Sequence, residues 1–157
     1  QAVGAERVIW IDRGLVGDHT DGHVDNLARF VSTTRVVCMQ GTSSDPNLKI
    51  LKELRQTLEQ ARTARGEALE LVELPSPGAI SGPDGQMAAS YCNFLISNRC
   101  VIVPVFGVAN DSAALRIIAD LFPDRRIVPL DAYALLTGGG TVHCISQQQP
   151  LAPPRHV

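Results

Sequence analysis

The sequence lacks the features that mark several large classes of protein. Lysine and arginine form no cluster and the formal net charge is −2, so nothing indicates binding to nucleic acid or to a membrane surface. No apolar run approaches the roughly 20 residues that a membrane-spanning helix needs. No Cys-x-x-Cys pair is present, which disfavours a zinc or thioredoxin-like site.

The first seven residues also lack two common features. They show no charged stretch followed by an apolar one, and they contain no initiator methionine. We expect position 1 to be the boundary of an excised or truncated segment.

What is present is an ordinary soluble composition. The 157 residues are 45% hydrophobic and 19% charged, which suffices for a single domain over residues 1–157 with its own core. Three of the four cysteines, Cys38, Cys92 and Cys100, stand in apolar runs and are expected to be small buried residues in a reducing cytoplasm. Cys144 differs because it follows three glycines and a histidine.

Patterning predicts an α/β fold with mixed sheets. One helix is expected to begin with Asp45 as its cap and Pro46 in its first turn, and a second to begin near Asn110 and stop at Pro123. The expected strands cover residues 8–11, 35–39, 69–74, 91–96, 101–105, 126–130 and 142–145, with a loop over 75–85. The order strand, strand, helix, strand (ββαβ) is therefore used more than once.

Residues 18–26 form the first segment rich in reactive side chains, with three aspartates and two histidines. In an extended strand His23 and Asp25 would share a face with Asp21, whereas a tight turn around Gly22 would regroup them. A histidine beside a carboxylate suits general acid–base chemistry, and Asp25 could also hold a cationic group. A solvated acidic loop and a metal site are the alternatives.

Residues 138–146 form the second such segment, three glycines followed by a predicted short strand. A cysteine just past a glycine turn lies near backbone N–H groups, which can lower a thiol pKa and stabilise developing negative charge. The alternative for Cys144 is a buried strand cysteine beside a structural turn. His143 is expected to face away from its neighbour on the strand, which makes His23 the better candidate for the working histidine.

The chain resembles the agmatine deiminase and bacterial-type peptidylarginine deiminase family of the pentein, or guanidine-modifying, superfamily. The resemblance runs from about Trp10 to Pro150. It is carried by these strings: Asp18-His19-Thr20-Asp21-Gly22-His23-Val24-Asp25-Asn26, Ala89-Ser90-Tyr91-Cys92-Asn93-Phe94, Val103-Pro104-Val105-Phe106-Gly107, Leu121-Phe122-Pro123-Asp124-Arg125, and Gly138-Gly139-Gly140-Thr141-Val142-His143-Cys144-Ile145-Ser146-Gln147-Gln148-Gln149-Pro150.

The resemblance implies ββαβ modules around a pseudo-fivefold axis, of which this chain would hold roughly three, the C-terminal portion. It implies Cys144 as nucleophile, His23 as general acid–base and Asp25 as the carboxylate that holds a guanidinium, with Asp21, Gly139 and Gly140 also at the substrate. Cys144 would attack the guanidinium carbon, ammonia would leave, and water would release a ureido product. No cofactor and no metal are implied. The substrate would be agmatine, as in putrescine biosynthesis, or an arginine derivative.

The chain departs from the family pattern in length and at two positions. Family members are about twice as long, and the N-terminal part that is lacking supplies further acidic residues, so we expect this chain to be inactive alone. Thr141 stands where an asparagine is usual, and His19 where an acidic or other polar residue is usual.

Other functions stay open on the sequence. The chain could be a truncated, non-catalytic binding protein that self-associates to cover exposed sheet edges, which predicts a homo-oligomer. A related amidinotransferase or dimethylarginine hydrolase activity is a third possibility.

Overall fold

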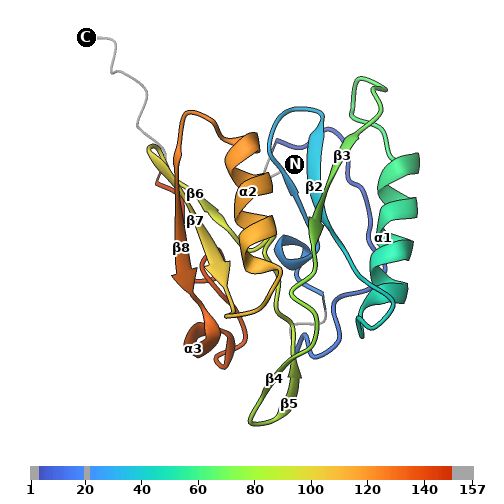
Figure 1. Ribbon diagram of the computed structural model, residues 1–157. Coiled ribbons are helices and arrows are strands. Elements are labelled where there is room, and N and C mark those ends of the chain that lie inside the picture. Colours follow the sequence, from blue (N-terminus) through green and yellow to red (C-terminus); the bar gives the residue numbers. More distant parts are fainter. Residues whose placement is uncertain (1–3, 20–21, 150–157) are drawn as a thin grey trace.

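The computed structural model describes residues 4–19 and 22–149, and it contains two ββαβ units (Figure 1). The first comprises β1 (Ala28–Phe30), β2 (Arg35–Gln40), α1 (Leu48–Gln60) and β3 (Glu70–Pro75). Strand β2 lies in the middle, antiparallel to β1 and parallel to β3. The crossover from β2 to β3 runs through α1, as a parallel connection requires.

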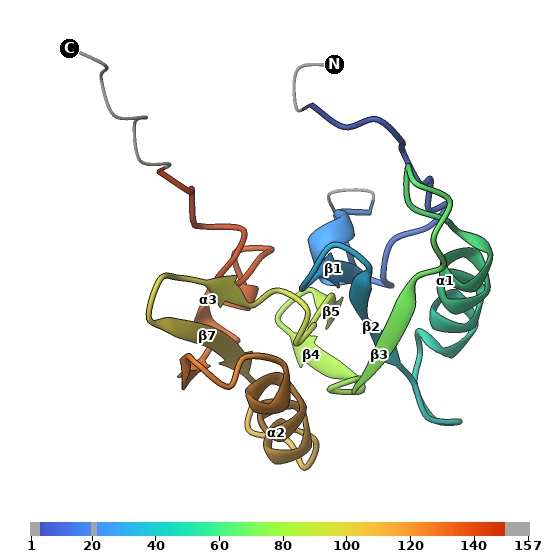
Figure 2. The same cartoon turned by 90° about the horizontal axis from the view of Figure 1, so that it is seen from above.

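The second unit repeats this arrangement. It comprises β6 (Leu95–Ile96), β7 (Cys100–Val105), α2 (Asp111–Leu121) and β8 (Arg126–Asp131). Strand β7 is antiparallel to β6 and parallel to β8. Helix α2 contacts both β8 and the last strand of the first unit, β3, and therefore joins the two units, as Figures 1 and 2 show.

Shorter elements connect and flank the units. A hairpin of β4 (Ile80–Gly82) and β5 (Gly85–Met87) lies between them, a single 3-10 turn, η1 (Val24–Asn26), precedes the first, and α3 (Tyr133–Leu136) follows the second. The α/β class and the partial propeller are confirmed. Two of the roughly three expected modules are complete in the described residues. Nothing among those residues has the length and hydropathy of a membrane-spanning helix.

The core explains why these elements form. Helix α1 buries Leu51, Leu54 and Leu58, which recur at helical spacing and face the first sheet. The middle strands are the most buried, because a strand with neighbours on both edges and a helix across one face loses most of its contact with water. In helix α2 the side chains of Ala114 and Ile118 are fully buried.

Several predicted boundaries need correction. Helix α1 begins at Leu48 with Asn47 as its N-cap residue, so Asp45 and Pro46 precede the helix. The Asp45 side chain instead accepts a hydrogen bond from the Asn47 N–H at 2.7 Å, which closes a turn before the helix. The expected loop over residues 75–85 contains the start of the β4–β5 hairpin, whose tight turn uses Gly85 at φ +111°.

Three predicted strands are absent or shortened in the described residues. Residues 8–11 form no strand, because no neighbouring strand pairs with them there. Residues 91–94 form a turn in which Ser90 Oγ accepts the Cys92 N–H at 3.0 Å, so that β6 keeps only two residues. Residues 142–145 form turns rather than a strand.

Candidate active site

The turn at Gly22 positions the first group of site residues. Gly22 has φ +113°, and the His23 N–H donates to Asp18 Oδ2 at 3.2 Å. The chain then enters η1, of which His23 is the N-cap residue and Asp25 the second residue. Residues 24–26 therefore form a 3-10 turn and not an extended strand, although the side chains of His23 and Asp25 still lie close together. Asp21 lies outside the described residues.

The backbone of the glycine run lies so close to Cys144 and His19 that a side chain on Gly139 or Gly140 would not fit. A Cβ atom on Gly140 would lie 2.7 Å from Cys144 Cβ and 3.0 Å from its Sγ, and one on Gly139, at φ +96°, would collide with the His19 ring. These glycines and Cys144 line an open hollow of about 460 Å³ together with His23. The sulfur therefore faces solvent at a concave surface that could receive a ligand.

The structure brings His23, Asp25 and Cys144 together from the two segments. Their potential ligand atoms all lie within 4.8 Å of one another. The Cys144 thiol donates to Asp25 Oδ2 over a distance of 3.5 Å. Thiol, imidazole and carboxylate at this spacing can support nucleophilic catalysis, and the same three groups could also hold a metal ion.

The expectation that His143 faces away from Cys144 is wrong. His143 Nδ1 lies 2.6 Å from Asp25 Oδ2, the oxygen that the Cys144 thiol also contacts. The two neighbours can reach one oxygen because residues 142–145 turn, with the Ser146 N–H donating to the His143 carbonyl at 3.0 Å. His143 thus fixes the orientation of the carboxylate.

Asn93 is the central residue that sequence reasoning missed, although the string 89–94 contributed to the resemblance. Its side chain is fully buried. The amide nitrogen Nδ2 lies 2.9 Å from Asp25 Oδ2, 3.0 Å from Asn26 Oδ1 and 3.1 Å from Cys144 Sγ. Because an NH₂ group has two hydrogens, these three acceptors share two donors. One amide therefore links both reactive segments.

The oxygen of the same amide fixes the glycine-run segment. Asn93 Oδ1 accepts from Thr141 Oγ1 at 2.7 Å and from the His143 N–H at 3.0 Å. Thr141 is itself buried. Thr141 is thus part of the buried support for the segment that carries Cys144.

Arg29 holds the backbone on both sides of Asn93. One guanidinium nitrogen donates to the carbonyls of Cys92 and Phe94, at 3.2 and 2.8 Å, on either side of Asn93. The guanidinium also lies 4.9 Å from the centre of the Phe94 ring. Burial lowers the pKa of Arg29, while attraction to the Asp25 carboxylate opposes that effect.

The electrostatics distinguish Asp25 from the buried thiols. Burial alone would raise the pKa of Asp25, but hydrogen bonds from His143 and Cys144 and the charges of His143 and His23 outweigh it, and the pKa is lowered. Burial raises the pKa of Cys38 and raises that of Cys92 to about 12. Both therefore stay protonated thiols, while Asp25 is an anion at neutral pH.

Comparison with known proteins identifies the family. The sequence model of the family of Porphyromonas-type peptidyl-arginine deiminases matches residues 1–150. The chain belongs to this family. A Legionella pneumophila protein named "Putative agmatine deiminase" is 38% identical over 150 residues, which cover 94% of this chain and 43% of that protein. The agmatine deiminase of Stutzerimonas stutzeri is 35% identical, over 94% of this chain and 45% of its own.

A solved structure of a similar protein has the same fold. The agmatine deiminase of Enterococcus faecalis superposes with a TM-score of 0.85 at 33% identity, over 92% of this chain and 45% of the other. The chain thus spans less than half the length of the relatives that it matches.

Proposed function

We propose that this deiminase-family chain carries the nucleophile, the acid–base histidine and one anchoring carboxylate of an enzyme that converts a guanidinium group to a ureido group and ammonia. The observation that supports this most strongly is the convergence of Cys144 and His143 on Asp25 Oδ2, with His23 beside them. A thiol next to an ionised carboxylate is suited to a cationic electrophile, because the cation pairs with the carboxylate while its carbon meets the sulfur.

Substrate binding begins at Asp25. Within residues 4–19 and 22–149, all hydrogen bonds of this carboxylate reach Oδ2, which leaves Oδ1 for a guanidinium N–H. Asp21 is proposed as a second carboxylate at the substrate. Gly139 and Gly140 are proposed to let the substrate approach the sulfur, because a side chain at either position would fill that space.

The chemistry follows from the groups in place. The thiol proton passes to His23, and the Cys144 thiolate attacks the guanidinium carbon, forming a C–S bond and a tetrahedral adduct. His23 returns a proton to one amine, the C–N bond breaks, and ammonia leaves. Water then attacks the same carbon as His23 accepts one of its protons. The C–S bond breaks, His23 returns that proton to the sulfur, and the remaining hydroxyl proton of the product passes to ammonia. The sum is guanidinium plus water giving ureido product plus ammonium.

Asn93 lowers the energy of the charged states. Its Nδ2, 3.1 Å from the sulfur, can donate to the thiolate, and a hydrogen bond to a charged acceptor is about twice as strong as a neutral one. The same nitrogen donates to Asp25, so the carboxylate and the sulfur keep their relative position while the charge moves.

The relatives' names favour agmatine as substrate, with peptidyl-arginine and free arginine as the other candidates. Because the chain spans under half of these relatives, we propose that activity requires residues outside it. The proposed chemistry uses no cofactor and no metal, so ammonia release should survive treatment with EDTA. The four free cysteines fit the reducing cytoplasm that we propose as its location.

Ammonia release from agmatine tests the proposal. The samples are the 157-residue chain alone and a chimera in which this chain replaces the matching part of the Legionella pneumophila relative. We expect release from the chimera, none from the chain alone, and none from the chimera with Cys144→Ala. Val16→Ala, a substitution away from the cluster, is the control. A folded chimera that releases no ammonia from agmatine, arginine or an arginyl peptide would contradict the proposal.

The non-catalytic alternative makes a different prediction. A chain that only self-associates should be a dimer or larger oligomer and should keep Cys144 unreactive. Light scattering at high concentration, combined with alkylation of Cys144 followed by peptide mass spectrometry, separates the two functions. A monodisperse monomer with a reactive Cys144 favours the enzyme.

A further inference from the structure

The three groups that meet at the candidate active site are also a set of metal ligands. A thiolate, an imidazole and a carboxylate all bind zinc in proteins, and three protein ligands leave one position of the tetrahedron for water. The donor atoms of His23, Asp25 and Cys144 lie within 4.8 Å of one another. No second group of this kind occurs in residues 4–19 and 22–149.

The spacing of these donors fits a tetrahedral zinc ion. Zinc lies about 2.3 Å from sulfur and about 2.0 Å from nitrogen or oxygen, so neighbouring donors in its shell are roughly 3.3 to 3.6 Å apart. The Cys144 sulfur and Asp25 Oδ2 are already 3.5 Å apart. The third donor, His23, is exposed, so its ring can rotate toward the other two.

A zinc ion can replace the thiol proton between sulfur and oxygen. The Cys144 thiol donates toward Asp25 Oδ2. On binding, the S–H bond breaks, an S–Zn bond forms, and the proton passes to solvent without any change of oxidation state. The oxygen then contacts the metal in place of the hydrogen. The thiolate and the ionised carboxylate together balance the charge of Zn²⁺.

The groups behind the donors also suit a metal site. His143 Nδ1 lies 2.6 Å from Asp25 Oδ2 and fixes the carboxylate. Asn93 Nδ2 lies 2.9 Å from the same oxygen and 3.1 Å from the Cys144 sulfur, so one amide holds two of the donors. Hydrogen bonds of this kind orient metal ligands, and the loss of one typically lowers metal affinity about 10- to 100-fold.

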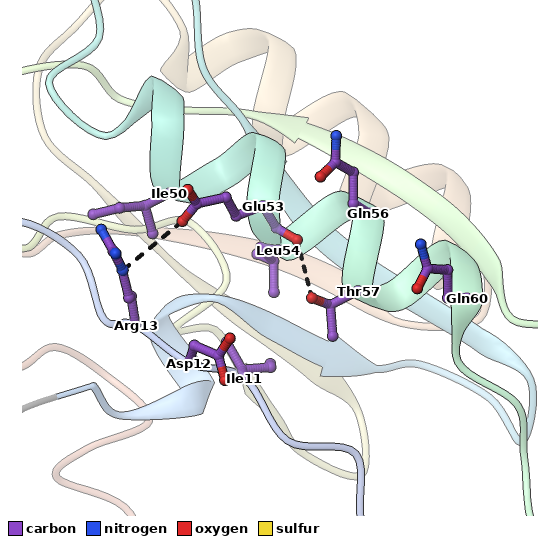
Figure 3. A pocket seen from close by; sticks show the side chains of 9 residues that line it. All are labelled: Ile11, Asp12, Arg13, Ile50, Glu53, Leu54, Gln56, Thr57 and Gln60. Atoms are coloured by element: carbon purple, nitrogen blue, oxygen red, sulfur yellow. Dashed lines mark hydrogen bonds and ion pairs between the residues drawn. The ribbon is translucent and has the colours of Figure 1, made fainter.

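The surroundings distinguish this site from another hollow that contains carboxylates. The open hollow around Cys144, of about 460 Å³, gives a hydrated ion access to the sulfur. The hollow beside α1 contains Asp12 and Glu53 but no thiol or imidazole, and Arg13 Nε lies 3.9 Å from Glu53 Oε2 (Figure 3). Its donors are oxygens and it already holds a cation, so it does not compete for zinc.

We propose that His23, Asp25 and Cys144 bind one Zn²⁺ ion per chain, with the fourth position open to water, and that the bound ion blocks the cysteine. The binding goes beyond the proposed deiminase chemistry and does not depend on it. The consequence for activity rests on the proposed function: the ion occupies the nucleophile, the acid–base imidazole and the anchoring carboxylate, so zinc and a guanidinium substrate exclude each other.

Cobalt serves as the spectroscopic probe of the site. Co²⁺ in a tetrahedral site with a thiolate ligand gives intense visible bands and a near-ultraviolet charge-transfer band, whereas hydrated Co²⁺ gives neither. Adding one equivalent to the reduced 157-residue chain should produce both, and one equivalent of Zn²⁺ should remove them. Cys144→Ala should lose the charge-transfer band. Cys100→Ala, at the other cysteine that is not buried, should keep it.

Competition with a chromophoric zinc chelator measures the affinity and assigns the other two ligands. Asp25→Asn and His23→Ala should each weaken zinc binding by at least the factor of about 10 to 100 that the loss of a supporting group causes. Asp12→Asn, at the carboxylate of the contrasting hollow, should bind as the parent chain does. Circular dichroism shows that each variant is folded.

Protection of the thiol tests the site without any substitution. Saturating Zn²⁺ should slow iodoacetamide labelling of Cys144 several-fold, while labelling of Cys100 in the same sample stays unchanged. Mg²⁺, which prefers oxygen ligands, should not protect Cys144. In a chimera that releases ammonia from agmatine, zinc should inhibit the release and EDTA should restore it. An inactive chimera would contradict the proposed function and leave the binding measurements unaffected.

Four results would overturn the proposal. The first is a folded parent chain that shows neither the charge-transfer band nor protection of Cys144. The second is a band that persists in Cys144→Ala, which would assign the metal to another cysteine. The third is unchanged zinc affinity in folded Asp25→Asn and His23→Ala, which would reduce the site to a single thiolate. The fourth is one ion shared by two chains, detected by light scattering.

Discussion

Asn93 offers the sharpest test of how the two reactive segments are held together. Replacement by leucine preserves the approximate volume but removes both ends of the amide. The Thr141 hydroxyl loses its acceptor, Asn93 Oδ1 at 2.7 Å, and Asn26 Oδ1 loses its donor, Asn93 Nδ2 at 3.0 Å. Both residues are buried, so water does not replace the lost partners. It also removes the donor next to Asp25 and Cys144.

The expected magnitudes follow from these contacts. A buried polar group left unsatisfied costs about 1–3 kcal/mol, so two such groups should lower the free energy of unfolding by about 2–6 kcal/mol in Asn93→Leu. A hydrogen bond to a charged sulfur is worth about 1.5–3 kcal/mol. Since 1.4 kcal/mol corresponds to a factor of about ten, alkylation of Cys144 should slow roughly 10- to 100-fold.

Asn93→Asp separates the two ends of the amide. It keeps an oxygen for Thr141 but places a second carboxylate where the nitrogen lies 2.9 Å from Asp25 Oδ2. Like charges at this distance repel, so the stability should recover as the pH falls and one carboxyl takes up a proton. Alkylation should stay slow, because the donor to the sulfur is lost.

Urea unfolding and iodoacetamide labelling, with the Cys144 peptide quantified by mass spectrometry, give both quantities. Asn98, exposed in the turn between β6 and β7, supplies the matched controls Asn98→Leu and Asn98→Asp. If Asn93→Leu unfolds at the same urea concentration as the parent chain and Cys144 reacts at the same rate, the amide does not link the segments and the reasoning fails.

Three further predictions concern single contacts. The folded chain lowers the pKa of Asp25 below its ordinary 3.8, so the stabilisation by its ionised form is complete above pH 3.8 and is lost as the pH falls through the lower folded value. In Asp25→Asn the urea concentration at the unfolding midpoint should therefore fall less steeply as the pH is lowered. Asp124→Asn, at an exposed position, should leave this pH dependence unchanged. Gly140→Ala should slow alkylation of Cys144, because the added Cβ would lie 2.7 Å from the Cys144 Cβ. Gly138→Ala should change the rate little, and equal rates in the two variants would refute the contact. Tyr91→Phe removes the 2.6 Å hydrogen bond from the Tyr91 hydroxyl to Asp111 of α2. The free energy of unfolding measured in urea should fall by about 2 kcal/mol. An unchanged free energy would show that this bond does not stabilise the fold.

The parts of the fold that the sequence predicts are those with a strong local pattern. Leu51, Leu54 and Leu58 carry enough helical periodicity to reveal α1 without knowledge of its neighbours. The six-residue strands β2, β7 and β8 are β-branched and apolar, and they lie where the pattern predicts. Residues 142–145 have a similar local pattern, but the His143 N–H donates to the side-chain and backbone oxygens of Asn93, and these bonds favour turns. Contacts between residues so far apart in the chain cannot be recognised from the local sequence.

The site shows the same limit. Cys144, His23 and Asp25 stand out because reactive residue types gather beside glycine turns. Asn93 does not stand out, since an asparagine between a cysteine and a phenylalanine has no periodicity or spacing that distinguishes it from a turn residue. Its role depends on contacts 51 and 68 positions away in the chain.

The geometry of the site follows from the way the units are joined rather than from any one unit. Each linker after a final strand contributes a different group: Asn93 from the linker after β3 and Cys144 from the linker after β8. The linker after residues 8–11 contributes His23 and Asp25. A relative shift of two units would separate the Cys144 sulfur from Asp25 without disturbing either core. Contacts that join units, such as those between α2 and β3 and those of Asn93, therefore hold the Cys144 sulfur beside Asp25 more directly than the packing within a unit does.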